Sequence, residues 1–161
     1  MAIIVFLAGC TTVPFTGQTD QEQSVQIRVG NNGETTQTFE VHTVEPGTNF
    51  TINYPGDRVG NHTIGEGSRQ INSGDGSYFE SVEVPDSARN HGQYTLQPGQ
   101  GTERNITEFS SPFAVIIVVY QSEKEVLAVV SVNCGDASLT GLEVKSDENS
   151  GNGVNVAHSC E

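Results

Sequence analysis

Apolar and polar residues alternate with a period of two along much of the chain, which is typical of half-buried β-strands. The alternation is clearest where Val25, Ile27 and Val29 are separated by polar residues. Turn-forming residues interrupt the pattern, for example at positions 45–47 (Glu-Pro-Gly) and 98–99 (Pro-Gly). No helical period longer than two turns occurs, so the pattern predicts an all-β fold.

One region is apolar at nearly every position instead of alternating. Residues 113–120 form a continuous β-branched run, and residues 126–132 follow after a short polar break. Length and β-branching favour two adjacent, central, antiparallel strands that are buried on both faces. Ala114, Ile116, Val118 and Tyr120 would form one face, and Phe113, Val115, Ile117 and Val119 the other. One face should pack against an opposing sheet. The other face must be covered by a loop, by residues 10–23 (the tether described below) or by a partner chain.

Residues 56–77 carry the weakest pattern, because they are rich in Gly, Asn and Ser. We expect a long loop or an irregular hairpin around Ile64 and Ile71. Residues 102–109 are expected to form an edge strand. Together, about nine short strands separated by turns predict an antiparallel β-sandwich.

The first residues have a different character. Residues 2–8 are uninterrupted apolar, and Gly9, Cys10 and two threonines follow. The run is shorter than the ~20 residues needed to span a bilayer, but it fits the end of a signal-peptide hydrophobic region. Leu7-Ala8-Gly9-Cys10 resembles the lipobox of secreted lipoproteins. The resemblance implies that the Cys10 thiol accepts a lipid, that residues 1–9 are removed, and that the lipid anchors the protein lastingly. The alternative is a buried N-terminal strand with an incidental cysteine.

The leader departs from the lipoprotein pattern in one respect, since no positively charged region precedes the apolar run. We therefore expect the true leader to extend upstream of Met1. Residues 10–23 are polar, with Pro14 and Gly17, and are expected to be a flexible tether. Val13 and Phe15 leave a short strand as the alternative. The sequence thus divides into a signal remnant (1–9), a tether (10–23) and a β-domain (24–161).

The alternating start of the β-domain and the turns at 44–48 and 96–99 resemble immunoglobulin-like domains of lipoproteins from extreme halophiles. The resemblance extends over roughly residues 24–145. It implies an immunoglobulin-like sandwich of about nine strands, carried on the outer face of the cell membrane.

The excess of acidic residues indicates which partners and which environment the protein is suited to. Against 20 acidic residues the chain has 7 basic ones, and its net charge is −13. A nucleic-acid partner is excluded because phosphate binding needs a basic patch, and an anionic lipid surface would repel the domain. The acid excess, scarce Lys and plentiful Thr, Asn and Gly favour adaptation to high salt. An ordinary acidic, soluble surface is the alternative.

The chain has three cysteines. If Cys10 carries a lipid, Cys134 and Cys160 remain as a pair, and an oxidising compartment favours a disulfide between them. Such a bridge would fasten the last strand to the core. Two free thiols, or metal ligands together with a histidine, are the alternatives.

Known catalytic and metal-binding patterns are missing from the sequence. The four histidines are scattered, and residues 147–153 lack key positions of a calcium loop. Neither a nucleophile elbow nor a phosphate-binding loop occurs. We therefore expect no enzymatic activity, no metal and no cofactor.

Three sequons make Asn49, Asn61 and Asn105 candidate N-glycosylation sites. Asn61 falls in the predicted loop and is expected to be the most accessible. Asn49 and Asn105 adjoin predicted strands, which would shelter them.

These features predict a lipid-anchored, extracytoplasmic, non-enzymatic module that binds or packs in the cell envelope. Its partners would be the membrane, through the lipid, and other envelope proteins or further copies of itself. One alternative is a subunit of a surface filament or envelope spike that assembles by strand addition, with residues 11–23 as a donor. Another is a small solute-binding component or enzyme, which would need a concave pocket.

Overall fold

The computed structural model describes residues 24–161 except 74–77, 108, 110–111, 123–124 and 148–152. The described residues form twelve strands in three sheets, joined by turns, and no helix is found among them. The predicted all-β class is confirmed. The strand count is higher than the expected nine, and the third sheet was not foreseen.

Sheet A has four strands in the order β12-β11-β1-β8. The pair β1–β11 is parallel, whereas β8 and β12 pair antiparallel with their neighbours. The expectation of a purely antiparallel sandwich is therefore wrong for this pair, because β1 and β11 are far apart in the sequence and no turn between them fixes an antiparallel direction. As predicted from residues 102–109, β8 lies at an edge. The bounds are β1 (Val25–Asn31), β8 (Gly101–Ile106), β11 (Leu139–Asp147) and β12 (Gly153–Cys160).

Sheet B has five strands in the order β5-β10-β9-β2-β7. Its pairs are all antiparallel, and β9 and β10 are neighbours inside the sheet, which confirms the predicted central pair. The bounds are β2 (Gln37–Val44), β5 (Gly67–Asn72), β7 (Arg89–Leu96), β9 (Ala114–Ser122) and β10 (Glu125–Asn133).

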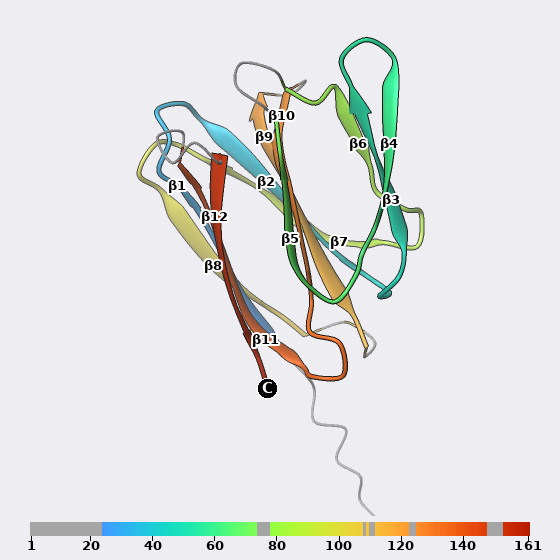
Figure 1. Ribbon diagram of the computed structural model, residues 1–161. Helices are drawn as coiled ribbons and strands as arrows, with labels where there is room; N and C mark the ends of the chain where they lie inside the picture. The colour runs from blue at the N-terminus through green and yellow to red at the C-terminus, as the bar shows by residue number, and fades with distance from the viewer. Residues whose placement is uncertain (1–23, 74–77, 108, 110–111, 123–124, 148–152) are drawn as a thin grey trace, which may run out of the picture.

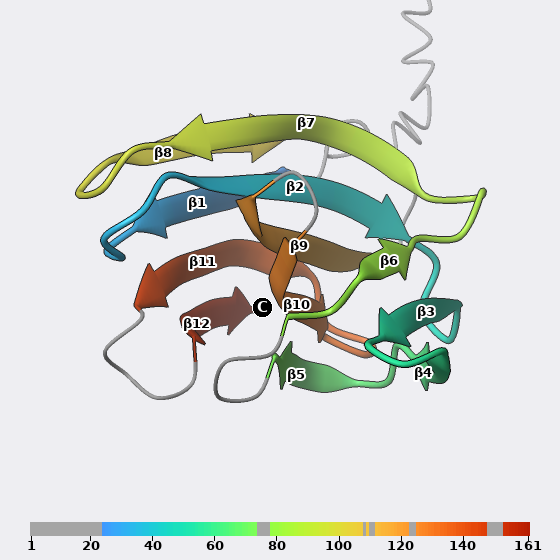
Figure 2. The same ribbon diagram turned by 90° about the horizontal axis from the view of Figure 1, so that it is seen from above.

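Sheet C is small, with β3 (Asn49–Tyr54) between β4 (Arg58–Thr63) and β6 (Ser81–Glu83). It lies beside sheet B on the side away from sheet A (Figures 1 and 2). The expectation of a long loop or irregular hairpin over 56–77 is therefore wrong, because β4 and β5 form here in two different sheets. Most of their residues are only partly buried or exposed, so their sequences lack a strong apolar alternation.

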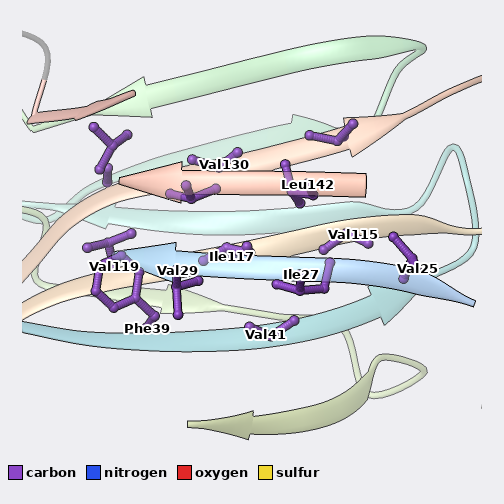
Figure 3. Close-up of a cluster of buried hydrophobic side chains, with 14 of the residues drawn as sticks. Val25, Ile27, Val29, Phe39, Val41, Val115, Ile117, Val119, Val130 and Leu142 are labelled. Carbon is purple, nitrogen blue, oxygen red and sulfur yellow. The ribbon is translucent and has the colours of Figure 1, made fainter. Parts of the chain in front are cut away.

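The first hydrophobic core lies between sheets A and B. Val25, Ile27 and Val29 of β1 point toward Phe39 and Val41 of β2 (Figure 3). The same core includes the predicted face of Phe113, Val115, Ile117 and Val119. Alternation along the first part of β1 thus buries Val25, Ile27 and Val29 and directs Gln26 and Arg28 to the other side of the strand.

The second core lies between sheets B and C. Ile116 and Val118 of β9 pack with Phe50 and Ile52 of β3 and with Val129 of β10. Ala114 belongs to the same cluster, and Tyr120 packs against it, so both predicted faces are confirmed. The cover for the second face was left open between a loop, the tether and a partner chain. Sheet C of the same chain provides it.

A buried asparagine ties together the turns at one end of the sandwich. Asn31 Nδ2 donates to the carbonyl oxygens of Thr35 and Leu96, at 2.7 and 2.8 Å. Its Oδ1 accepts from the Gly33 N–H at 2.9 Å. These bonds satisfy a fully buried amide and fix the turn after β1.

Candidate functional site

The residues expected to carry the lipid anchor, Leu7 to Cys10, lie outside the described part of the chain. Lipidation of Cys10 therefore stays a prediction. The described chain shows where the first strand starts: Val25 pairs with Ile106 at the end of β8, and Gln26 pairs with Gly141 near the start of β11. Among the described residues, no helix is both long and apolar enough to cross a membrane.

The predicted Cys134–Cys160 disulfide is present. Cys134 directly follows β10 of sheet B, and Cys160 ends β12 of sheet A, with their Cα atoms 5.7 Å apart. This separation lies within the usual range for disulfides. Ser138 and Glu161 exchange two backbone hydrogen bonds beside the bridge, at 2.7 and 2.9 Å. The bridge joins the two main sheets at the end where β1 begins, because Leu139 opposite Cys160 starts β11.

The asparagines of the three sequons all lie in strands. Asn49 begins β3, Asn61 lies in β4 and Asn105 in β8, and all three side chains are exposed. Two expectations are thus wrong: Asn61 is not in a loop, and Asn49 and Asn105 are not sheltered. Residues i and i+2 of a strand share a face, so Asn49 and Thr51 point the same way in β3, as do Asn61 and Thr63 in β4. Whether any sequon is glycosylated stays a prediction.

Two of the sequons pair with each other across the β3–β4 hairpin. Thr51 Oγ1 donates to Asn61 Oδ1 at 3.0 Å, and Thr63 Oγ1 donates to Asn49 Oδ1 at 2.6 Å. Each bond occupies the amide oxygen. Within the described chain, neither amide nitrogen, the atom a glycan would modify, has a hydrogen-bond partner.

The sequence did not indicate a polar network on the outer face of sheet B. Glu40 of β2 accepts hydrogen bonds from Tyr120 Oη of β9, at 2.9 Å, and from Asn90 Nδ2 of β7, at 2.8 Å. His42 Nε2 lies 3.2 Å from Glu40 Oε1, but without the geometry of a hydrogen bond. The spacing of Glu40 and His42 puts them on one face, yet only the pairing of β2 with β7 and β9 brings in Asn90 and Tyr120.

Burial sets the protonation of this network. Burial lowers the pKa of His42, although the neighbouring Glu40 opposes the shift. Burial, followed by the hydrogen bond to Glu40, raises the pKa of Tyr120 well above its usual value. At neutral pH the imidazole is therefore neutral and the phenol remains a donor. The arrangement suits a fixed structural network that joins three strands.

The four histidines lie in four different strands, of which only β2 and β7 pair with each other. His42 lies in β2, His62 in β4, His91 in β7 and His158 in β12. In the described ranges, no group of three His, Cys, Asp or Glu side chains could hold a metal ion. Cys160 is in the disulfide, so the alternative in which His158 and a free thiol bind a metal is wrong. The interior of the acidic turn 147–153 lies outside the described residues.

Two hollows flank Pro112 and Phe113 at the disulfide end. One, of about 390 Å³, is lined by residues that include Thr43, Glu45 and Arg89. The other, of about 450 Å³, is lined by the turn after β10. Thr43, which is 5% exposed, lies with its Oγ1 2.7 Å from His91 Nε2.

No family model matches this sequence, and no match is found among curated proteins or among solved structures. Fold and geometry therefore define the class: an all-β domain of three sheets, with one disulfide between its two main sheets.

Proposed function

We propose that this protein is a lipid-anchored, extracytoplasmic surface protein that acts as a non-enzymatic binding or structural module of the cell envelope. The observation that carries the proposal is the run Leu7-Ala8-Gly9-Cys10, which follows an apolar segment and precedes a polar one. A thiol at this point is the acceptor for a diacylglyceryl group in the lipoproteins that the run resembles. Such an anchor would hold the domain on the outer face of the membrane.

The disulfide supports an extracytoplasmic location, because disulfides persist in oxidising compartments. The position of β1 supports a defined orientation. A tether that enters at Val25 would place the disulfide end near the membrane. The opposite end, with the turns that follow Asn31 and Leu96, would then face outward and be accessible to partners.

Two further features belong to the proposal. The packing of two sheets against each other supports an immunoglobulin-like sandwich, and the parallel pair β1–β11 is where this chain departs from the antiparallel pattern of that fold. The net charge of −13 supports a protein adapted to high salt, where repulsion between carboxylates is screened.

The direct test compares the native protein with a Cys10→Ser variant in the source cells, and Thr11→Ser is the matched control. We expect the wild type and the control in the membrane fraction, with an intact mass that corresponds to a chain beginning at Cys10 plus lipid. Cys10→Ser should leave the membrane fraction. Membrane-extracted wild type with an unmodified segment 1–9 would rule the proposal out.

A second candidate function is a subunit of a surface assembly built by strand addition. The specific observation is the open edge of sheet C at β4, where Val59 is 63% exposed. Val59 is the large apolar residue most exposed to solvent within the described chain, and β4 has no proline or lysine to block pairing. Light scattering of the wild type, Val59→Lys and the control Ala157→Lys would test it. Concentration-dependent assembly lost only in Val59→Lys supports this function, and a monomer at every concentration excludes it.

A further inference from the structure

The outer face of sheet A, on the side of the molecule away from sheet C (Figure 2), contains a hollow of about 290 Å³. Its lining includes Gly30 of β1 and Gly101 at the start of β8, which pair directly across the two strands. Neither glycine has a positive φ, and the pairing of β1 with β8 keeps a regular register up to this point. The backbone conformation therefore does not require glycine here. Glycine in a regular strand often marks a place where a ligand approaches the backbone closely.

Two ion pairs form the walls of the hollow. Arg28 of β1 pairs with Glu103 of β8 at 2.6 Å, and Lys145 of β11 pairs with Glu143 at 2.7 Å. Arg28 lies opposite both glutamates in the strand pairing. The hydrogen bond from Lys145 is the largest cause that lowers the pKa of Glu143, and the charge of Arg28 contributes to this shift. The four side chains therefore form one electrostatic unit of two positive and two negative charges.

The floor between these walls is made of carbon groups. An added Cβ at Gly30 would lie 3.2 Å from Lys145 Cγ and 3.8 Å from Lys145 Cε, so the stem of this lysine lies over the glycine. An added Cβ at Gly101 would lie 3.3 Å from the Val29 carbonyl oxygen. The hollow thus combines glycine Cα atoms and lysine methylene groups with charged hydrogen-bonding groups at its sides.

The charges at the hollow favour an uncharged polar ligand. The carboxylates offset the attraction of Arg28 and Lys145 for an anion, and the net charge of −13 repels anions further. A cation would meet the two basic groups in the same way. Among the described residues, neither Arg28 nor Lys145 has a second carboxylate within ion-pair distance, so each has donors that its one pair does not use. A hydroxyl group both donates and accepts, and can therefore join an ion pair without breaking it.

We propose that this hollow binds one sugar residue of an uncharged glycan. The ring lies on the glycine floor, and its hydroxyl groups bond to Lys145, Glu143 and Arg28. The volume of about 290 Å³ is just below the usual ~300–1,000 Å³ of small-molecule pockets, which suits a single ring. The glycan could belong to another envelope component, or it could be attached to Asn105 of the same chain, which shares this face of β8 with Gly101.

The test is an NMR titration of the full chain, produced without glycans, with the methyl glycosides of glucose, galactose, mannose and N-acetylglucosamine. The amide signals of Gly30, Gly101 and Thr102 are followed. We expect saturable shifts in the millimolar range with at least one glycoside, and none with glycine or sodium sulfate at the same ionic strength. The absence of saturable shifts with all four glycosides would overturn the proposal. Tighter binding of glycine or sulfate would also overturn it, and would assign the hollow to a zwitterion or an anion. No result depends on the lipid anchor, so this inference and the proposed function can fail separately.

Substitutions in the floor and the wall test the position of the site. Gly101→Leu is expected to abolish binding, because its side chain fills the hollow. Glu143→Ala should weaken binding about tenfold, the effect of losing one charge-assisted hydrogen bond. Gly141→Leu is the matched control, since Gly141 lies on the same face of sheet A outside the hollow, and an added Cβ there makes an ordinary contact, 3.6 Å from Ser159 Oγ. Thermal melting checks that each variant folds. Equal losses in Gly101→Leu and Gly141→Leu, or unchanged affinity in Glu143→Ala, would contradict the proposal.

Protein purified from the source cells, as wild type and as Asn105→Gln, identifies where the sugar comes from. If the hollow holds a glycan attached to Asn105, the wild type should give no shift with the added glycoside, whereas Asn105→Gln should bind it. If the hollow serves an external glycan, both proteins should bind the glycoside with the same affinity. Binding by neither protein would contradict the proposal.

Discussion

The outer faces of the two main sheets differ in one decisive way: one is covered and the other is open. The outer face of sheet B lies under sheet C, and its strand β9 buries Ile116 and Val118 there. The outer face of sheet A carries charged side chains in ion pairs: Arg28 of β1 pairs with Glu103 of β8, and Glu143 pairs with Lys145 of the same strand, β11. The contrast follows the sequence, since β9 is apolar at consecutive positions and β1 alternates. Hydrophobic periodicity therefore reports whether a strand has one buried face or two.

The strongest test of this contrast introduces the same carboxylate on both faces. Ile116→Asp is expected to unfold the domain, because an unpaired buried charge costs several kcal/mol. Ile117→Asp, on the other side of the same strand, should also unfold it, because that face lies in the first core. Asn155→Asp, at an exposed position on β12, should change the free energy of unfolding by no more than about 0.5 kcal/mol. Urea denaturation measures all three. A folded Ile116→Asp variant would mean that sheet C does not cover sheet B in solution.

The disulfide gives the next largest effect, since it is a covalent cross-link between sheets A and B in addition to the backbone connections. The double variant Cys134→Ala/Cys160→Ala is expected to lose roughly 3.5 kcal/mol of unfolding free energy, from the entropy of a loop of this length. Sheet C has no such link to its neighbour in the described chain, so its packing should rest on the second core alone. Urea unfolding of the variant and of reduced wild type should agree. A loss below about 1 kcal/mol in both would show that the bridge does not constrain the unfolded chain as expected.

Added salt should weaken the interactions between exposed charged groups, whereas the apolar packing of sheet C on sheet B does not depend on such charges. The repulsion that follows from a net charge of −13 should weaken as potassium chloride rises to molar levels, so the melting temperature should increase. Screening also weakens the surface pairs Arg28–Glu103 and Lys145–Glu143, but exposed pairs contribute only about 0–1 kcal/mol each. Calorimetric scans at increasing salt measure the balance. A constant melting temperature would leave an ordinary acidic domain and remove the high-salt interpretation.

The smallest expected effect is a pH dependence from His42. Its pKa in the folded protein is lowered by burial from about 6.5, so the unfolded chain binds more protons as the pH falls below that value. Stability should therefore decrease on acidification from pH 7 toward pH 5. His42→Gln should show a shallower decrease, because it removes this titration.

Wild type and His42→Gln have the same carboxylates. The difference between the pH dependences of their free energies of unfolding therefore reports the titration of His42. His62→Gln is the matched variant. It should change the slope of the free energy of unfolding against pH less than His42→Gln does, because His62 is more exposed. Equal slopes for the wild type and His42→Gln would show that His42 is not held neutral.

Several features of the fold could be predicted from the sequence. The apolar run 113–120 predicted a central strand, and the division of its side chains between two faces is confirmed. This prediction worked because side chains alternate along a strand by local geometry alone. The number of cysteines and the expected compartment predicted the Cys134–Cys160 bridge, which the structure contains.

Other features depended on contacts between distant segments. Strands β4 and β5 were missed because they bury few apolar residues, so their local pattern is weak. The parallel pair β1–β11 joins residues more than a hundred positions apart, and no local signal selects such a partner. Glu40, Asn90 and Tyr120 meet for the same reason.

For β1, β9 and β10, the sequence by itself determined whether one face or both faces of the strand are buried, because hydrophobic periodicity reflects burial. Only the tertiary structure decided that a third sheet of the same chain covers the apolar face of β9. Apolar burial is not directional, so an apolar face requires cover but does not specify which segment provides it. The specific partners follow from strand pairing and packing of the whole chain.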